Sequence, residues 1–198
     1  MKTLFLLLLF VNFSLGPTFY SKLSDAALEL TKDDVKYVPA YVAIKYPGGD
    51  VPRNTGVCTD VIIRAYRKLG LDLQQEVHLD MKSNFSKYPK TWGLRKPDPN
   101  IDHRRVPNLQ VFFSRFGEKK PVTQDAANYK TGDIVTWMIN GKLPHIGIVT
   151  NRKSRDGKRN LIVHNVGSGQ VLEDCLFAYP ITGHYRFGHH YENRKPLR

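Results

Sequence analysis

Apolar positions along this 198-residue chain follow two different periods. In the first part they recur every three or four residues, as on amphipathic helices. One such stripe runs through Leu23, Ala27, Leu30 and Val35, and a second runs through Val61, Ile62, Ala65, Tyr66 and Leu69. Gly70 follows the second stripe and supplies a helix stop. A third, short helix is predicted from residue 109 to the glycine at 117.

Later segments are rich in β-branched and aromatic residues and are separated by turn residues, which predicts strands. These segments are residues 132–139, 145–151, 160–167 and 181–188. Residues 40–52 also alternate like a short strand, and residues 78–108 form a long, polar, proline-punctuated loop or lid. Helices followed by strands predict an α+β fold, with N-terminal helices packed on a small antiparallel curled sheet.

The N-terminal residues 1–21 predict a signal peptide or an N-terminal anchor. They hold Lys2, a short apolar run and then small residues. Cleavage after Gly16 satisfies the small-residue rule, although Pro17 follows it. We expect one domain over residues 22–191 and a basic tail over 192–198. The protein is then exported, periplasmic or secreted, monomeric, and without a stable membrane span once the signal is removed.

The formal net charge is +12. Nucleic acid is not the expected partner, because an exported chain rarely meets it and the sequence has no zinc-finger spacing or stacking platform. Peptidoglycan or another anionic envelope polymer fits this charge better. The alternative is a basic surface that is simply solvated.

Cys58 is one of only two cysteines, and it directly precedes the second helical stripe. It falls on the same face as Val61 and Ile62, so it lies in the first turn and points toward the core. It is either a packing residue or a nucleophile. Cys175 has no helix start beside it and is read as structural. Export permits a disulfide between the two cysteines, but a domain of this size does not need one.

Two histidines lie on neighbouring predicted strands. Strand alternation puts His145 on one face with Gly147, and puts His164 on one face of the next strand. A wide loop over residues 151–158 sets the histidines opposite each other, whereas a tight turn at residues 156–157 displaces them by four residues, roughly 13 Å. Both registers keep the side chains on one face. Gly147 is expected to leave room for the start of the Cys58 helix.

A thiol at a helix start facing two histidines predicts a Cys58–His145–His164 triad. An unperturbed thiol has a pKa of about 8.5, and a helix terminus shifts it by roughly one unit. An ion pair with His145 is therefore needed to form the thiolate. Asp60 is expected to project from the other side of the helix. Backbone N–H groups at the helix start, including that of Cys58, are expected to stabilise the oxyanion.

Several motifs resemble a known family. "YPGGDVP", "GVCTDVIIRAYR", "PDPNIDHRRVPNL", "GDIVTW", "LPHIGIV", "VHNVGSG" and "ITGHYR" are similar to the DUF1287 family over about residues 25–191. More distantly, four of these motifs resemble the NlpC/P60-type, papain-like cysteine peptidases. That resemblance implies Cys58 as nucleophile, His145 as general base and His164 as the orienting third member. It also implies cleavage of amide bonds in peptidoglycan. Thr59 stands where those peptidases often have serine.

The block from Trp92 to Asn108 has no counterpart in the NlpC/P60 pattern. Within it, Arg104 and Arg105 have two interpretations. They form a clamp for substrate carboxylates, or they belong to an Arg–Asp network with Asp98 and Asp102 that holds the loop. A metal site from Asp102, His103, His145 and His184 has no supporting ligand spacing, so neither metal nor cofactor is expected.

The sequence thus predicts an exported cysteine amidohydrolase or peptidase. The alternatives are a thiol acyltransferase on the same scaffold and a non-catalytic envelope-binding module.

Overall fold

Four α-helices form within residues 16–188, the part of the chain that the computed structural model describes. They are α1 (Phe19–Leu30), α2 (Cys58–Lys68), α3 (Leu73–Asn84) and α4 (Val106–Phe116). The Thr18 hydroxyl caps α1 by accepting the Ser21 N–H, and Gly70, with φ +82°, ends α2 as predicted. Short 3₁₀ turns follow at η1 (Phe85–Lys87), η2 (Asp102–Arg104) and η3 (Ala126–Asn128).

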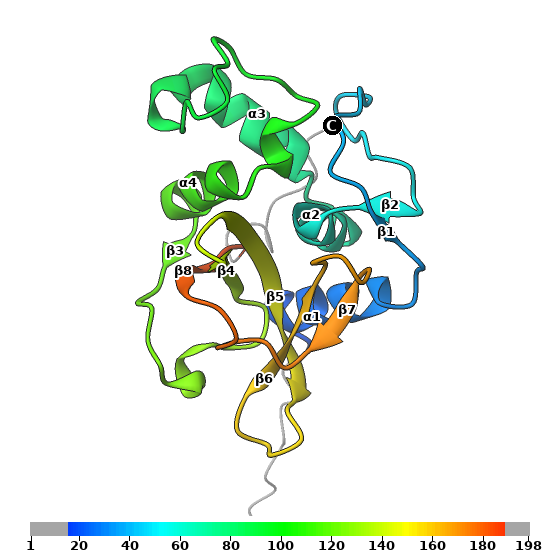
Figure 1. The fold of residues 1–198 in the computed structure, drawn as a ribbon, viewed down its shortest axis with the longest axis vertical. Helices are drawn as coiled ribbons and strands as arrows, with labels where there is room; N and C mark the ends of the chain where they lie inside the picture. The colour runs from blue at the N-terminus through cyan, green and yellow to red at the C-terminus, as the bar shows by residue number, and fades with distance from the viewer. Residues whose placement is uncertain (1–15, 189–198) are drawn as a thin grey trace, which may run out of the picture.

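The predicted antiparallel sheet is confirmed. Its strand order is β3-β8-β4-β5-β6-β7, and each pair of neighbouring strands in it is antiparallel. The strands are β3 (Glu118–Lys119), β4 (Ile134–Ile139), β5 (Leu143–Lys153), β6 (Asn160–His164), β7 (Val171–Glu173) and β8 (Ile181–Arg186). A separate parallel pair joins β1 (Lys36–Tyr37) to β2 (Thr55–Gly56). The fold is therefore α+β (Figure 1).

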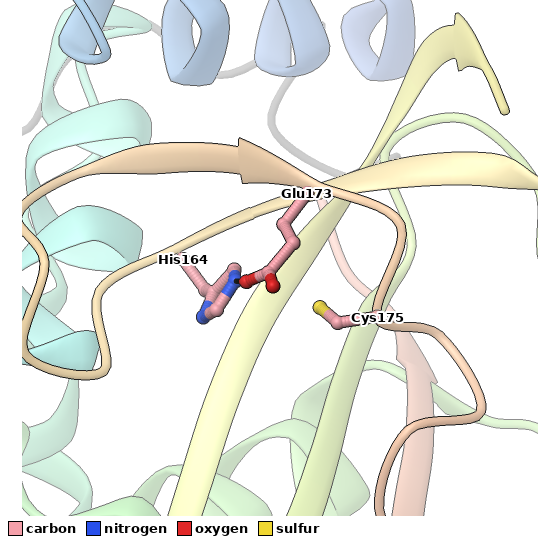
Figure 2. A group of neighbouring side chains, drawn as sticks. All are labelled: His164, Glu173 and Cys175. Atoms are coloured by element: carbon pink, nitrogen blue, oxygen red, sulfur yellow. Dashed lines mark hydrogen bonds and ion pairs between the residues drawn. The ribbon is translucent and has the colours of Figure 1, made fainter. Parts of the chain in front are cut away.

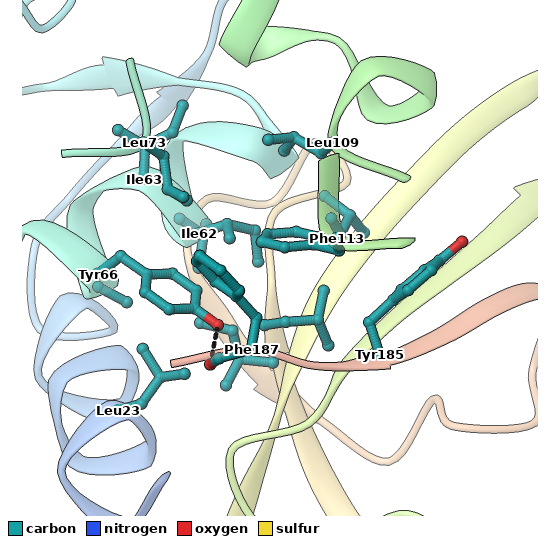
Figure 3. Close-up of a cluster of buried hydrophobic side chains, with 14 of the residues drawn as sticks. Leu23, Ile62, Ile63, Tyr66, Leu73, Leu109, Phe113, Tyr185 and Phe187 are labelled. Atoms are coloured by element: carbon teal, nitrogen blue, oxygen red, sulfur yellow. Dashed lines mark hydrogen bonds between the residues drawn. The ribbon is translucent and has the colours of Figure 1, made fainter. Parts of the chain in front are cut away.

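The main core lies between the helices and one face of the sheet (Figure 3). Tyr66 and Phe113 stack from α2 and α4, and the Tyr66 hydroxyl donates to the Phe187 carbonyl at 3.0 Å. A smaller cluster around Trp137 covers the other face of the sheet. Alternation along β5 therefore points Ile146 toward the helices and His145 toward the Trp137 side.

Two sequence predictions need correction. Residues 40–52 do not form a strand; pairing occurs earlier, at β1. The first part of the predicted loop is helical, because residues 73–84 form α3 around buried Leu73, Val77 and Met81. Helix α1 begins at Phe19, inside the segment of residues 1–21 for which a signal peptide or anchor is predicted, and Phe19 is buried against Tyr66.

The remaining terminal predictions, for residues 1–15 and 189–198, lie outside the described residues. Among residues 16–188, no helix has both the length and the apolar character that crossing a membrane requires.

Candidate active site

Cys58 is the first residue of α2, as the sequence predicts. Val57 before it is extended, and its N–H donates to Asp60 Oδ2 at 2.7 Å, which closes the first turn of the helix. The Cys58 side chain belongs to the main core and is only 5% exposed. The N–H of Ile146 faces the thiol and acts to lower its pKa. The sulfur therefore lies beside the peptide group that links Ile146 to His145.

The two histidines meet through a register that neither predicted loop provides. Lys153 pairs with Asn160 near the turn, whereas Ile148 pairs with Val163, and a bulge separates these two parts of the hairpin. Extending the second register puts His164 opposite Gly147, two residues from the position opposite His145. The imidazoles bridge this diagonal, since His145 Nε2 lies 2.9 Å from His164 Nδ1. The prediction that both share one face is confirmed.

Gly147 makes room for a different neighbour from the one expected. A Cβ at this position would lie 2.6 Å from Ile162 Cγ2 and 3.3 Å from His164 Cβ. The missing side chain therefore lets β6 approach β5 closely, and the start of α2 does not fill that space. This close approach brings His164 within reach of His145.

Glu173 extends the histidine pair, and sequence analysis missed it. Its Oε2 lies 2.9 Å from His164 Nε2 (Figure 2). The glutamate comes from β7, which pairs with β6 and is only three residues long. A strand this short leaves no periodic pattern in the sequence. Glu173 comes close to His164 because β7 pairs with β6, with Val171 opposite His164.

Burial sets the protonation of the resting site. It raises the pKa of the Cys58 thiol to about 12, while N–H groups of Ile146, Thr59 and Cys58 itself act in the opposite direction. Burial, with a smaller effect of His164, lowers the pKa of His145 to about 3. The expected thiolate–imidazolium pair is therefore wrong for the resting state, in which both groups are neutral.

The comparisons with known proteins place the chain in a family. The sequence profile described as "Domain of unknown function (DUF1287)" matches residues 24–187. The chain belongs to the DUF1287 family. A relative titled "Uncharacterized protein YijF", from Escherichia coli (strain K12), is 48% identical over 165 residues, which are 83% of this chain and 80% of the relative. The resemblance to DUF1287 proposed from the motifs is thus confirmed.

A solved structure, NlpC1 from Trichomonas vaginalis, is similar over 84% of this chain with 15% identity and a TM-score of 0.45. The DUF1287 chain spans 44% of that protein.

Within this DUF1287 domain, Arg104 holds the start of α2. Its Nε and Nη2 donate to the two Asp60 carboxylate oxygens at 2.8 and 2.9 Å, and both side chains are 3% exposed. The buried guanidinium is committed to Asp60, which corrects the prediction of a substrate clamp at Arg104. Asp60 also acts on the thiol, because its charge raises the Cys58 pKa, contrary to the expectation that it faces away. Burial raises the pKa of Tyr37, and the charges of Cys58 and Asp60 raise it further.

Arg105 fits the network interpretation more closely. Its Nη1 lies 3.3 Å from Asp102 Oδ1, and its guanidinium stacks 4.1 Å from the centre of the Trp92 ring. Asp102 in turn accepts the Asp98 N–H. Part of the Arg105 side chain stays exposed, so a role in substrate binding remains a prediction for this residue.

The four residues weighed as metal ligands, Asp102, His103, His145 and His184, do not form a group of ligands within residues 16–188. His184 pairs with Asp133, and His103 lies in η2 with an unpartnered Nδ1. In residues 16–188, one imidazole nitrogen of His164, a Glu173 oxygen and the Cys175 sulfur lie within 4.8 Å of one another (Figure 2). Two of these atoms already share a hydrogen bond, so we assign the group to hydrogen bonding. Cys175 and Cys58 are both free thiols.

Proposed function

We propose that this DUF1287 protein is an exported cysteine amidohydrolase that cleaves peptide amide bonds of peptidoglycan. The supporting observation is the linked pair of contacts at one end of β5. The Cys58 thiol, at the start of α2, lies beside the Ile146 N–H, while the adjacent His145 is held by His164 at 2.9 Å. A nucleophile, a base and an orienting group are then provided by three elements of a rigid scaffold.

The reaction begins with a neutral thiol and a neutral imidazole. His145 takes the thiol proton as the sulfur attacks the amide carbon, and a C–S bond forms. The same proton passes to the leaving nitrogen as the C–N bond breaks. Water then attacks the thioester, giving one proton to His145, and the thiol is regenerated with the carboxylic acid as second product.

Negative charge develops during the attack, first on the sulfur and then on the carbonyl oxygen, and backbone N–H groups near Cys58 are in place to stabilise it. The N–H groups of Ile146, Thr59 and Cys58 all stabilise negative charge on the sulfur, as their effect on the Cys58 pKa indicates. The N–H of Cys58 is also the proposed oxyanion donor, since the first N–H groups of a helix lack helical acceptors. The roles of Cys58 and His145 are catalytic, and His164 orients His145.

Substrate entry requires a local opening of the site. Cys58 is 5% exposed and His145 is 2% exposed. This burial also supports a second candidate, a non-catalytic envelope-binding module in which Cys58 only packs. Such a module predicts that the thiol never becomes a nucleophile toward any envelope polymer.

The test is digestion of purified peptidoglycan by the chain from residue 17 onward, with products identified by mass spectrometry. New muropeptides from the wild-type protein and from Cys175→Ala, but none from Cys58→Ala, are expected. Cys175→Ala is the matched control because it removes the other buried thiol. Products that carry a transferred acyl group would replace hydrolysis by acyl transfer. Folded protein that binds peptidoglycan without products would support the binding module.

The proposed export and the peptidoglycan partner share a further test. Fractionation of cells that express the full chain should recover the protein outside the cytoplasm. Recovery in the cytoplasm would refute export and, with it, this substrate.

A further inference from the structure

A continuous line of hydrogen bonds links an exposed carboxylate to the buried His145. Glu173, whose side chain is 56% exposed, lies 2.9 Å from His164 Nε2. His164 Nδ1 lies 2.9 Å from His145 Nε2. His145 Nδ1 makes no hydrogen bond with any other residue of the described range. It is the one nitrogen of the pair that remains free for the thiol proton.

The proton positions along this line follow from its outer end. An ionised carboxylate only accepts hydrogen bonds, so Nε2 of His164 must carry the proton of that bond. In neutral imidazole the other nitrogen is then an acceptor. His164 Nδ1 therefore accepts from His145 Nε2, which must carry the hydrogen. His145 Nδ1 is left with a lone pair.

We propose that Glu173 is a positioning residue that fixes the tautomers of His164 and His145 and so keeps His145 Nδ1 available as a base. The use of that base rests on the proposed function, whereas the tautomers rest on the hydrogen bonds alone. Without the carboxylate, the donor and acceptor of the hydrogen bond between His164 and His145 can exchange roles. His145 then carries its hydrogen on Nδ1 and has no site there for the thiol proton.

Other groups around the histidines do not provide an alternative acceptor. Cys58, at the start of α2, belongs to the core on the helix side of the sheet, and its thiol faces the Ile146 N–H. Cys175, after β7, is a buried thiol whose pKa burial raises to about 12. Asp174 is bound to Arg159 at 2.7 Å. Trp137 faces His145 but donates its indole N–H to the Leu176 carbonyl. Glu173 is the carboxylate bonded to the pair.

The primary test is ¹⁵N NMR of the histidine rings in the uniformly labelled chain from residue 17 onward, near neutral pH. Protonated and lone-pair nitrogens of neutral imidazole have well separated shifts. In the wild type, Nε2 of both histidines should be protonated and both Nδ1 atoms bare. Glu173→Gln should give a mixed or reversed pattern, because an amide can also donate. Asp174→Asn is the matched control and should keep the wild-type pattern.

A wild-type spectrum with hydrogen on His145 Nδ1 would overturn the inference, as would an unchanged pattern in Glu173→Gln. The second readout is peptidoglycan turnover. Glu173→Gln should lower kcat by about 10²-fold or more with little change in KM and shift the acidic limb of the pH profile. Glu173→Asp should recover part of the rate, and Asp174→Asn all of it. Predicted tautomers without wild-type turnover would refute the proposed function and leave the tautomer assignment standing.

Discussion

Replacing Arg104 by methionine should destabilise the domain strongly, because it leaves the Asp60 carboxylate buried without its partner. Arg104 makes two charge-assisted hydrogen bonds to Asp60, at 2.8 and 2.9 Å, between side chains that are each 3% exposed. Removing one partner from such a buried pair costs about 3–5 kcal/mol. For a domain of this size, that lowers Tm by about 6–20 °C.

The measurement is urea unfolding of four proteins: the wild type, Arg104→Met, Asp60→Asn and the double variant. The amide that Asp60→Asn introduces keeps an acceptor for the Val57 N–H, so the cycle isolates the charge pair. The double variant should lose markedly less stability than the sum of the single variants. Arg105→Met is the control; its one ion pair, at 3.3 Å, is weaker, and about 1 kcal/mol or less is expected.

A cost below about 1 kcal/mol for Arg104→Met, with no coupling to Asp60, would refute this reasoning. Binding of substrate carboxylates by Arg104, as one interpretation of the sequence predicts, would then explain why this arginine is present. A clamp predicts a higher KM with unchanged stability, whereas the observed pair predicts lost stability first.

Three further predictions follow from burial and packing. In a Cys175→Ser background, Cys58 should react with iodoacetamide at least about tenfold more slowly than a free thiol, because burial raises its pKa to about 12. A rate equal to that of free cysteine would show an accessible thiol with an ordinary pKa, and a faster rate would show a preformed thiolate. Burial lowers the pKa values of His145 and His103 to about 3, so the unfolded chain binds more protons between that value and about 6.5. Stability should fall as pH is lowered through this window and level off below it, and urea midpoints that stay constant from about pH 7 to about pH 4 would contradict this. Gly147→Ala places a Cβ 2.6 Å from Ile162 Cγ2, so it should lower the free energy of unfolding by about 1–3 kcal/mol, as measured in urea. It should also loosen the His145–His164 contact. A variant as stable as the wild type would mean that β6 moves away without cost.

The helix at Cys58 could be predicted because its signals are local. The apolar stripe through Val61, Ile62 and Tyr66, and the stop at Gly70, depend only on the helical period and on backbone sterics. For the same reason, alternation correctly placed His145 and His164 on one face. Helix α3 was missed because its buried face is short and its sequence is mostly polar.

The protonation of the site was not predictable from local signals. A helix terminus and a nearby histidine favour a thiolate, but the desolvation of Cys58 outweighs them. The degree of burial depends on the sheet and loops that close over α2, and no short motif contains that information.

The amino-acid sequence by itself determined the α+β class, the position of Cys58 at a helix start and the shared face of the two histidines. Periodicity and parity are properties of a few consecutive residues. Only the tertiary structure decided which side chains meet. The bulge in the β5–β6 hairpin sets the histidine diagonal, β7 brings Glu173 to His164, and the fold buries Arg104 against Asp60. These contacts join residues 9 to 44 positions apart, so their geometry comes from packing across elements.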